Sequence, residues 1–214
     1  MKDSGVMTGR GLFVVFEGGD GAGKTTQADA LASWLVAQGR EAVRTFEPGD
    51  TAAGATMRRI VLDPATGDLA PWAEALLYAA DKAQHVHEVI RPALARGAVV
   101  VCDRYTDSML AYQGAGRVLP LEQVQQVAEW ATGGLRPDLT VLLDLDPRDG
   151  VGGIAEKDRV EGAGAEFHAR VREGFLKLAA RDPERYLVLG ARLPADEIAE
   201  LVRARIRLAF GQTL

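Results

Sequence analysis

Short apolar runs alternate along the chain with longer segments in which apolar residues recur every three or four positions. This alternation is typical of an α/β protein with a parallel sheet, because a helix returns the chain between successive parallel strands. Strands are predicted at 12–16, 42–46, 98–102, 139–145 and 186–189. Helices are predicted at 24–38, from 71 toward 92, from 120, at 166–181 and at 194–210.

Two segments fall outside this pattern. Residues 1–10 lack the apolar stretch of a secretory signal, and we expect a flexible tail ahead of one domain over 11–214. Residues 148–164 are rich in glycine and charge and have no helical period, which indicates a mobile lid. No apolar run approaches the about 18–20 residues of a membrane-spanning helix, so no membrane segment is predicted.

Composition narrows the class of protein further. The chain has 214 residues, of which 47% are apolar and 26% charged, as in ordinary soluble domains. A net charge of −5 gives no overall attraction for nucleic acid, and we expect none as a partner. The single cysteine, Cys102, fits a cytoplasmic location. His85, His87 and His168 show no metal-ligand spacing and are expected to be exposed on helices.

A phosphate-binding motif follows the first strand. Residues 18–25 are GGDGAGKT, which matches G-x-x-x-x-G-K-[ST] in the strand-to-helix context that the motif requires. The backbone N–H groups of such a loop surround phosphate, while Lys24 reaches the β- and γ-phosphates and Thr25 supports Mg²⁺. ATP or GTP binding is therefore predicted at Gly18, Gly19, Asp20, Gly21, Ala22, Gly23, Lys24, Thr25 and Thr26.

A second polar group ends the strand at 98–102. Ligands of parallel α/β sheets bind beyond the carboxyl ends of strands, so Arg104 should face the phosphate-binding loop. The planar guanidinium binds two phosphate oxygens at once. Asp103 has the character of the acidic residue that supports magnesium through water.

Six segments in order, FEGGDGAGKTT, EPGDT, LLYAADKAQH, DRYTDSMLAYQGAGR, LLDLDP and DRVE, resemble those of bacterial thymidylate kinases from about residue 12 to residue 186. The resemblance implies a P-loop fold with a five-stranded parallel sheet flanked by helices on both faces, in a homodimer. It also implies transfer of the γ-phosphoryl group of ATP to dTMP, with Mg²⁺ as cofactor.

The same resemblance assigns roles by position. Arg104 would hold the 5′-phosphate of dTMP, with Asp20 and Glu47 near the sugar or metal. Tyr78 would stack on thymine, and Tyr112 would lie under C2′ and disfavour ribose. The other residues expected at the acceptor site are Pro48, Arg58, Lys82, Ser108, Met109 and Gln113.

Three acceptor-site positions depart from the family pattern. Lys82 stands where arginine is general, Met109 where a serine or another polar residue is common, and Phe46 where arginine precedes Glu47. These changes bear on selectivity for thymine, because lysine lacks the fork and the stacking plane of arginine.

The lid also departs from the pattern. The P-loop has no basic residue besides Lys24, and residues 150–154 have no arginine. We therefore expect Arg159 and Lys157 to be the cations that close on ATP, acting in catalysis with Lys24, Arg104 and Asp20.

The residues leave other functions open. The acceptor could be another pyrimidine nucleotide, or a deoxynucleoside, for which Glu17 is the candidate base. A P-loop ATPase that works as a switch is the alternative from a different class.

Overall fold

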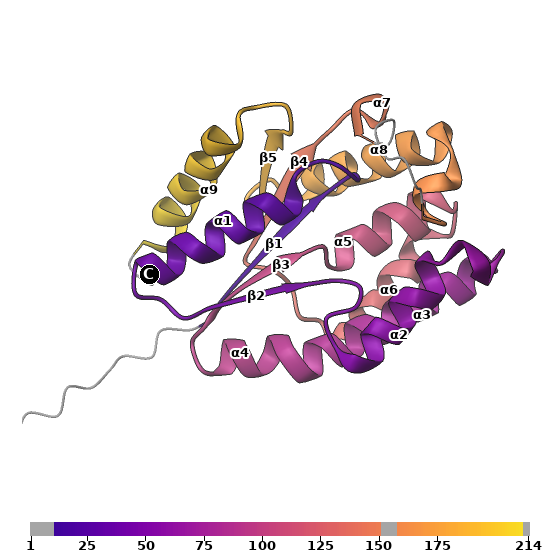
Figure 1. Ribbon diagram of the computed structural model, residues 1–214, viewed down its shortest axis with the longest axis horizontal. Coiled ribbons are helices and arrows are strands. Elements are labelled where there is room, and N and C mark those ends of the chain that lie inside the picture. Colours follow the sequence, from indigo (N-terminus) through magenta and orange to yellow (C-terminus); the bar gives the residue numbers. More distant parts are fainter. Residues whose placement is uncertain (1–10, 151–157, 212–214) are drawn as a thin grey trace, which may run out of the picture.

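The computed structural model describes residues 11–150 and 158–211. Its centre is a parallel sheet of five strands in the order β2-β3-β1-β4-β5 (Figure 1). The strands are β1 (Leu12–Gly18), β2 (Ala42–Phe46), β3 (Val99–Asp103), β4 (Leu139–Asp144) and β5 (Tyr186–Gly190). All five predicted strands are confirmed to within two residues at each end.

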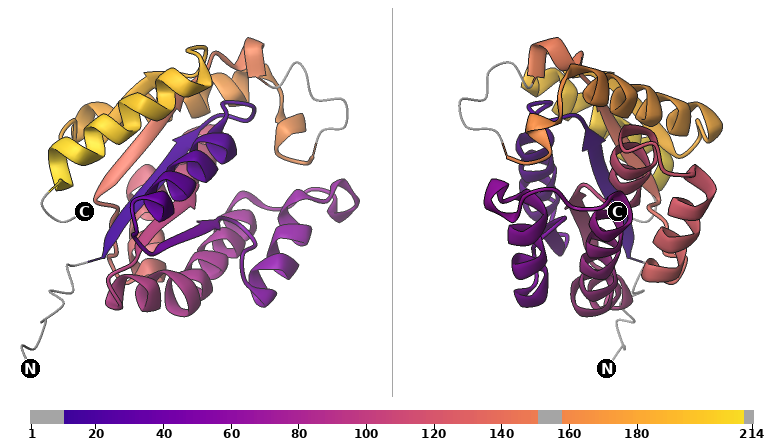
Figure 2. Two further views of the ribbon diagram at one scale, coloured as in Figure 1. Left: turned by 60° about the vertical axis from the view of Figure 1, so that its left-hand side comes forward. Right: turned by 90° about the vertical axis from the view of Figure 1, so that its right-hand side faces the viewer.

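Helices cover both faces of the sheet (Figure 2). On one face α1 (Lys24–Ala37) and α9 (Ala195–Phe210) pack on the β1 side chains of Leu12, Val14 and Phe16. Phe13 and Val15 point to the opposite face, as alternation along a strand requires. The remaining helices are α2 (Ala52–Leu62), α3 (Pro71–His85), α4 (Arg91–Ala95), α5 (Thr106–Met109), α6 (Leu121–Thr132), α7 (Pro147–Gly150) and α8 (Ala165–Arg181).

Some helices differ from the predictions. The helix expected from residue 71 toward 92 is α3 and α4 joined by a π-helical stretch, Val86–Ile90. The sequence patterns did not predict α2, although the side chain of Thr51 caps it by accepting from the Gly54 N–H. A second π-helical stretch, Leu110–Gly116, extends α5. Among the described residues, no helix is both long and apolar enough to cross a membrane.

Only parts of the predicted lid fall among the described residues. Its start forms α7, and its end contains a 3₁₀ turn at Glu161–Ala163 next to the buried side chain of Val160. Asp158 fixes this end, because its carboxylate accepts the N–H groups of Val160 and Glu161 at 2.8 Å each. Lys157 lies outside the described residues.

Candidate active site

The P-loop joins β1 to α1 and places Lys24 in a buried position. A Cβ at Gly18 would lie 2.4 Å from the Leu143 carbonyl oxygen, so glycine permits the close passage of the loop over β4. Nζ of Lys24 donates to the Gly19 carbonyl at 2.7 Å. Burial, followed by the charge of Arg104, lowers the pKa of Lys24 to about 8. The ammonium is therefore poised at the loop that would surround phosphate.

Thr25 and Asp103 meet directly behind the P-loop. The Thr25 hydroxyl donates to Oδ2 of Asp103 at 2.6 Å, and the guanidinium of Arg44 lies 3.7 Å from the same oxygen. Hydroxyl and carboxylate oxygens are ligands that Mg²⁺ prefers, with water and phosphate completing its shell. These two residues thus fit the metal role predicted from the sequence.

Arg104 lies where the P-loop meets the neighbouring cavity. Its backbone is left-handed, with φ at 68°, and its guanidinium donates to the Gly18 carbonyl at 3.0 Å and to the Ser108 hydroxyl at 3.1 Å. It also pairs with the carboxylate of Asp20 and lies 5.1 Å from the centre of the Tyr112 ring. Burial raises the pKa of Asp20, but Arg104 and then Lys24 outweigh it and hold that pKa below its usual value.

Glu17 is fully buried beneath Arg104 and acts as a backbone anchor. Its carboxylate accepts from the N–H groups of Tyr105 and Ser108, at 2.8 and 3.0 Å, and from the Ser108 hydroxyl at 2.6 Å. Burial and the nearby charge of Asp107 raise its pKa to about 7. Glu17 does not line the cavity, so the geometry gives no support to its role as the base of a deoxynucleoside kinase.

The residues expected at the acceptor site line one cavity beside the P-loop. It lies below the carboxyl ends of β1 and β3, between the α2–α3 pair and the segment after the lid. The structure brings together Asp20, Glu47, Pro48, Arg58, Tyr78, Lys82, Arg104, Ser108, Met109, Tyr112 and Gln113. The sequence analysis did not assign Leu62, Asp158, Val160 and Glu161 to the acceptor site, although the last three lie in the DRVE segment; they also line the cavity. Their roles toward dTMP stay predictions.

Glu47 and its partners form the buried end of this cavity. Lys82 donates to one carboxylate oxygen of Glu47, and Nδ1 of His85 lies 2.7 Å from the other. Burial raises the pKa of Glu47, but the Lys82 charge and the His85 contact outweigh burial and hold that pKa below its usual value. The carboxylate is therefore ionised. His85 is 1% exposed, and the expectation of an exposed helical histidine was wrong because β2 and the following loop pack on it.

Glu74, in the first turn of α3, accepts hydrogen bonds from three side chains. Its carboxylate accepts from the Gln113 amide at 2.9 Å, from Arg117 at 3.0 Å, and from Arg159. Arg159 also donates to the Val61 carbonyl at 2.9 Å. The structure therefore holds Arg159 on α2 and α3 at the acceptor side and does not bring it to the P-loop.

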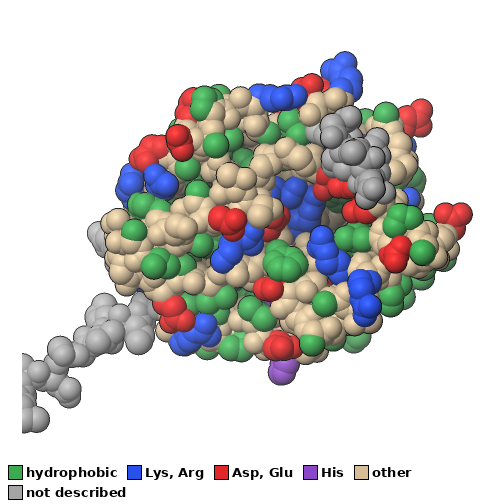
Figure 3. Space-filling view, viewed as in Figure 1, with side chains coloured by type: hydrophobic (Ala, Val, Ile, Leu, Met, Phe, Trp, Pro, Cys, Tyr) green, Lys and Arg blue, Asp and Glu red, His purple; other side chains and the backbone are tan. Residues whose placement is uncertain are grey.

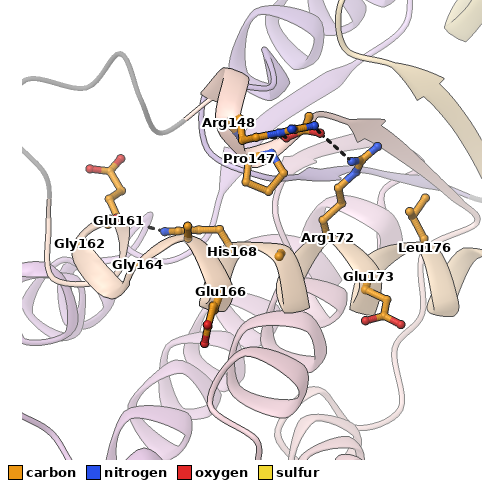
Figure 4. A pocket seen from close by; sticks show the side chains of 13 residues that line it. Pro147, Arg148, Glu161, Gly162, Gly164, Glu166, His168, Arg172, Glu173 and Leu176 are labelled. Atoms are coloured by element: carbon orange, nitrogen blue, oxygen red, sulfur yellow. Dashed lines mark hydrogen bonds and ion pairs between the residues drawn. The ribbon is translucent and has the colours of Figure 1, made fainter.

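A groove of about 940 Å³ opens between α7 and α8 (Figure 4). Arg148 and Arg172 both reach Asp146 there, and Nε2 of His168 lies 3.1 Å from the Glu161 carbonyl oxygen. His168 is 6% exposed, so the expectation that it lies exposed was also wrong, whereas His87 is exposed as expected. A smaller hollow connects these elements to Gly19 of the P-loop.

Charged side chains gather around the hollow on one face of the molecule. Figure 3 shows Lys and Arg side chains near the middle of this face, with Asp and Glu side chains beside them. This mixture suits a polyanionic ligand held at a few defined points rather than along an extended basic surface.

Comparison with known proteins decides the family. The thymidylate kinase family model matches residues 16–202, and a thymidylate kinase of Cutibacterium acnes is 61% identical over 196 residues, covering 92% of this chain and 96% of that protein. The chain belongs to the thymidylate kinase family. The thymidylate kinase of Deinococcus radiodurans is 52% identical over 200 residues, covering 92% and 97% of the two chains.

A solved thymidylate kinase has the same fold. The crystal structure of the enzyme from Ehrlichia chaffeensis matches with a TM-score of 0.76 at 29% identity, covering 92% of this chain and 98% of that one. The predicted fold and the resemblance to thymidylate kinases are thereby confirmed.

Proposed function

We propose that this chain transfers the γ-phosphoryl group of ATP to dTMP, giving dTDP and ADP. The observation that carries the proposal is the position of Arg104, which contacts the P-loop through Gly18 and the acceptor cavity through Ser108. Phosphoryl transfer needs little covalent chemistry from a protein and depends on aligning the two phosphates and stabilising their charge. A cation shared by both sites meets that need.

On the donor side, ATP would bind with its phosphates in the P-loop, Gly18 to Thr26. Lys24 would neutralise the β- and γ-phosphate oxygens, which costs little reorganisation because the side chain is already buried in the loop. Mg²⁺ would be held by Thr25 and, through water, by Asp103. When bound, the ion would add positive charge at the transferring oxygens.

On the acceptor side, Arg104 would grip the 5′-phosphate of dTMP with its planar fork. To bind the phosphate, Arg104 would give up its ion pair with Asp20. The Asp20 carboxylate would then be free to contact the sugar or the metal. Tyr78 and Tyr112 would pack on the base and sugar, and Tyr112 is already fixed by its hydroxyl, 3.0 Å from Asp20. Lys82 would donate to a carbonyl of the base.

The roles of the predicted lid cations stay separate proposals. Arg159 would reach ATP only by leaving Glu74 and the Val61 carbonyl. We therefore propose that the main role of Arg159 is to hold residues 158–161 at the acceptor cavity. A contact between ATP and Lys157 stays a prediction from the sequence.

We also propose a cytoplasmic homodimer. Helices α3 and α6 pack against each other and expose large apolar side chains, Leu76 at 53% and Trp130 at 85%. Exposed apolar patches of this kind mark association surfaces. Sedimentation of the purified protein at dimer mass, and of Trp130→Glu at lower mass, would support this assembly.

The test of the proposed reaction is ADP release from Mg-ATP with dTMP, dUMP, dCMP and thymidine offered in parallel. Rapid release with dTMP, absent in Lys24→Ala, supports the proposal. Preference for dUMP or dCMP would show that Lys82 and Met109 select another base. Release with thymidine alone would indicate a nucleoside kinase, and release independent of any acceptor would indicate an ATPase switch.

A further inference from the structure

A line of hydrogen-bonded side chains runs behind the acceptor cavity. Lys82 and His85, both on α3, contact the two oxygens of the Glu47 carboxylate. The opposite ring nitrogen of His85, Nε2, contacts the hydroxyl of Thr45 on β2. The same hydroxyl contacts the carboxylate of Asp50. The line therefore joins α3 to both β2 and the loop that follows it.

The middle of this line is closed to solvent. Glu47 is 3% exposed, Lys82 2%, His85 1% and Thr45 1%. Removing one partner from a buried ion pair is costly, since water cannot replace it. The position of the Glu47 carboxylate is therefore set by Lys82 on one oxygen and His85 on the other.

The protons in the line follow from its chemistry. An ionised carboxylate can only accept, so Nδ1 of His85 must carry the hydrogen that Glu47 receives. The Thr45 hydroxyl donates its single hydrogen to the Asp50 carboxylate, so toward Nε2 of His85 its oxygen can only accept. Both ring nitrogens therefore donate, Nδ1 to Glu47 and Nε2 to the Thr45 hydroxyl, and the hydrogen on Nδ1 is the one that fixes Glu47.

Only one end of the line reaches the ligand site. Glu47 and Lys82 line the acceptor cavity, whereas His85 does not. The Lys82 ammonium has three N–H donors, and Glu47 uses one of them. Its remaining donors can serve an acceptor only if Glu47 keeps the ammonium in place. His85 supplies that restraint from the side away from the cavity.

We propose that His85 is a positioning residue for the acceptor nucleotide: through Nδ1–H it holds Glu47, and Glu47 in turn aims the Lys82 ammonium at a carbonyl of the base. The inference rests on the proposed function, since it takes the cavity to be the dTMP site. It assigns a task to a histidine that touches neither substrate.

Two substitutions separate the positioning task from simple space filling. In His85→Asn the amide nitrogen sits one bond beyond Cγ, as Nδ1 does, and can still donate to Glu47. In His85→Gln the amide reaches further, toward the Nε2 position, and serves Thr45 instead. His87→Gln, on the exposed neighbouring histidine, is the matched control.

The expected result is an unequal effect on the acceptor. The KM for dTMP should stay within about threefold of wild type in His85→Asn and rise about tenfold in His85→Gln, as loss of one charge-assisted hydrogen bond implies. The KM for ATP should not change in either variant, and His87→Gln should match wild type. An equal rise in both variants, or a parallel rise in the KM for ATP, would overturn the proposal.

A measurement on the wild-type protein does not depend on whether the variants fold. Nuclear magnetic resonance with ¹⁵N-labelled histidine should show hydrogen on Nδ1 of His85 and a shift of that signal, but not of His87, when dTMP is added. A ring without hydrogen on Nδ1 overturns the proposal. Wild-type protein that neither binds nor phosphorylates dTMP would instead contradict the proposed function, whatever the state of the ring.

Discussion

The guanidinium of Arg104 pairs with the carboxylate of Asp20, joining the end of β3 to the P-loop. These residues meet because β1 and β3 are neighbouring parallel strands, with Phe16 opposite Asp103. Their carboxyl ends therefore open at one edge of the sheet, where the P-loop and the acceptor cavity share a wall.

Arg104→Lys should weaken the acceptor site far more than the ATP site. Lysine keeps the charge but loses the fork that contacts Gly18, Ser108 and Asp20. We expect kcat/KM for dTMP to fall about 10- to 100-fold, with little change in the KM for ATP. Steady-state kinetics measure both, and Arg136→Lys on the surface is the control. An equal rise in the KM for dTMP and the KM for ATP would indicate that Arg104 contacts ATP as well.

The affinity for ATP should depend on pH through Lys24. Its pKa is lowered to about 8, chiefly by burial, and only the charged form attracts phosphate oxygens. The affinity of the free protein for ATP should therefore fall as the pH rises through about 8. Binding titrations between about pH 7 and pH 10 measure this. In Lys24→Met the affinity should be weak and lack this step, and a wild-type profile without it would contradict the assignment.

Arg159→Ala tests the anchor at the acceptor cavity. Loss of the contacts with Glu74 and the Val61 carbonyl should loosen residues 158–161, which close the cavity. We expect the KM for dTMP to rise about tenfold with a small change in kcat. Lys177→Ala, which removes an exposed ion pair, is the control. A fall in kcat at unchanged KM for dTMP would instead support closure of Arg159 on ATP.

Gly18→Ala should destabilise the fold itself. Its φ of 140° and the Leu143 carbonyl, 2.4 Å from the added Cβ, leave no room for a side chain. We expect the free energy of unfolding to drop by about 2–4 kcal/mol, measured by denaturant titration. Gly19→Ala is the matched variant, since its Cβ would meet no atom within 4 Å. Equal stability of the two variants would contradict this interpretation.

Much of the site follows from local sequence, and the part that does not depends on long-range pairing. The P-loop and Arg104 lie in motifs whose spacing already indicates their place at the sheet edge, whereas the other acceptor residues were expected from the resemblance to thymidylate kinases. The role of Arg159 depends on Glu74, which is 85 positions away and belongs to no phosphate-binding pattern. Its position could not be predicted from the charge of the lid segment alone.

Burial of single histidines also escaped the sequence patterns. His85 follows the helical period of α3, but its neighbours in space, Thr45 and Glu47, come from β2 and the loop after it. His168 is likewise covered through a contact with Glu161. Helical periodicity indicates which face of a helix is apolar. It does not show that a polar residue on that helix has a buried partner elsewhere.

The most direct test of the central claim follows the phosphoryl group itself. ATP labelled at the γ-phosphate is incubated with Mg²⁺, dTMP and the protein, and the labelled products are separated. The account predicts labelled dTDP, formed in a one-to-one ratio with ADP and strongly reduced in Arg104→Lys. Label found in inorganic phosphate, with dTMP unchanged, would contradict it.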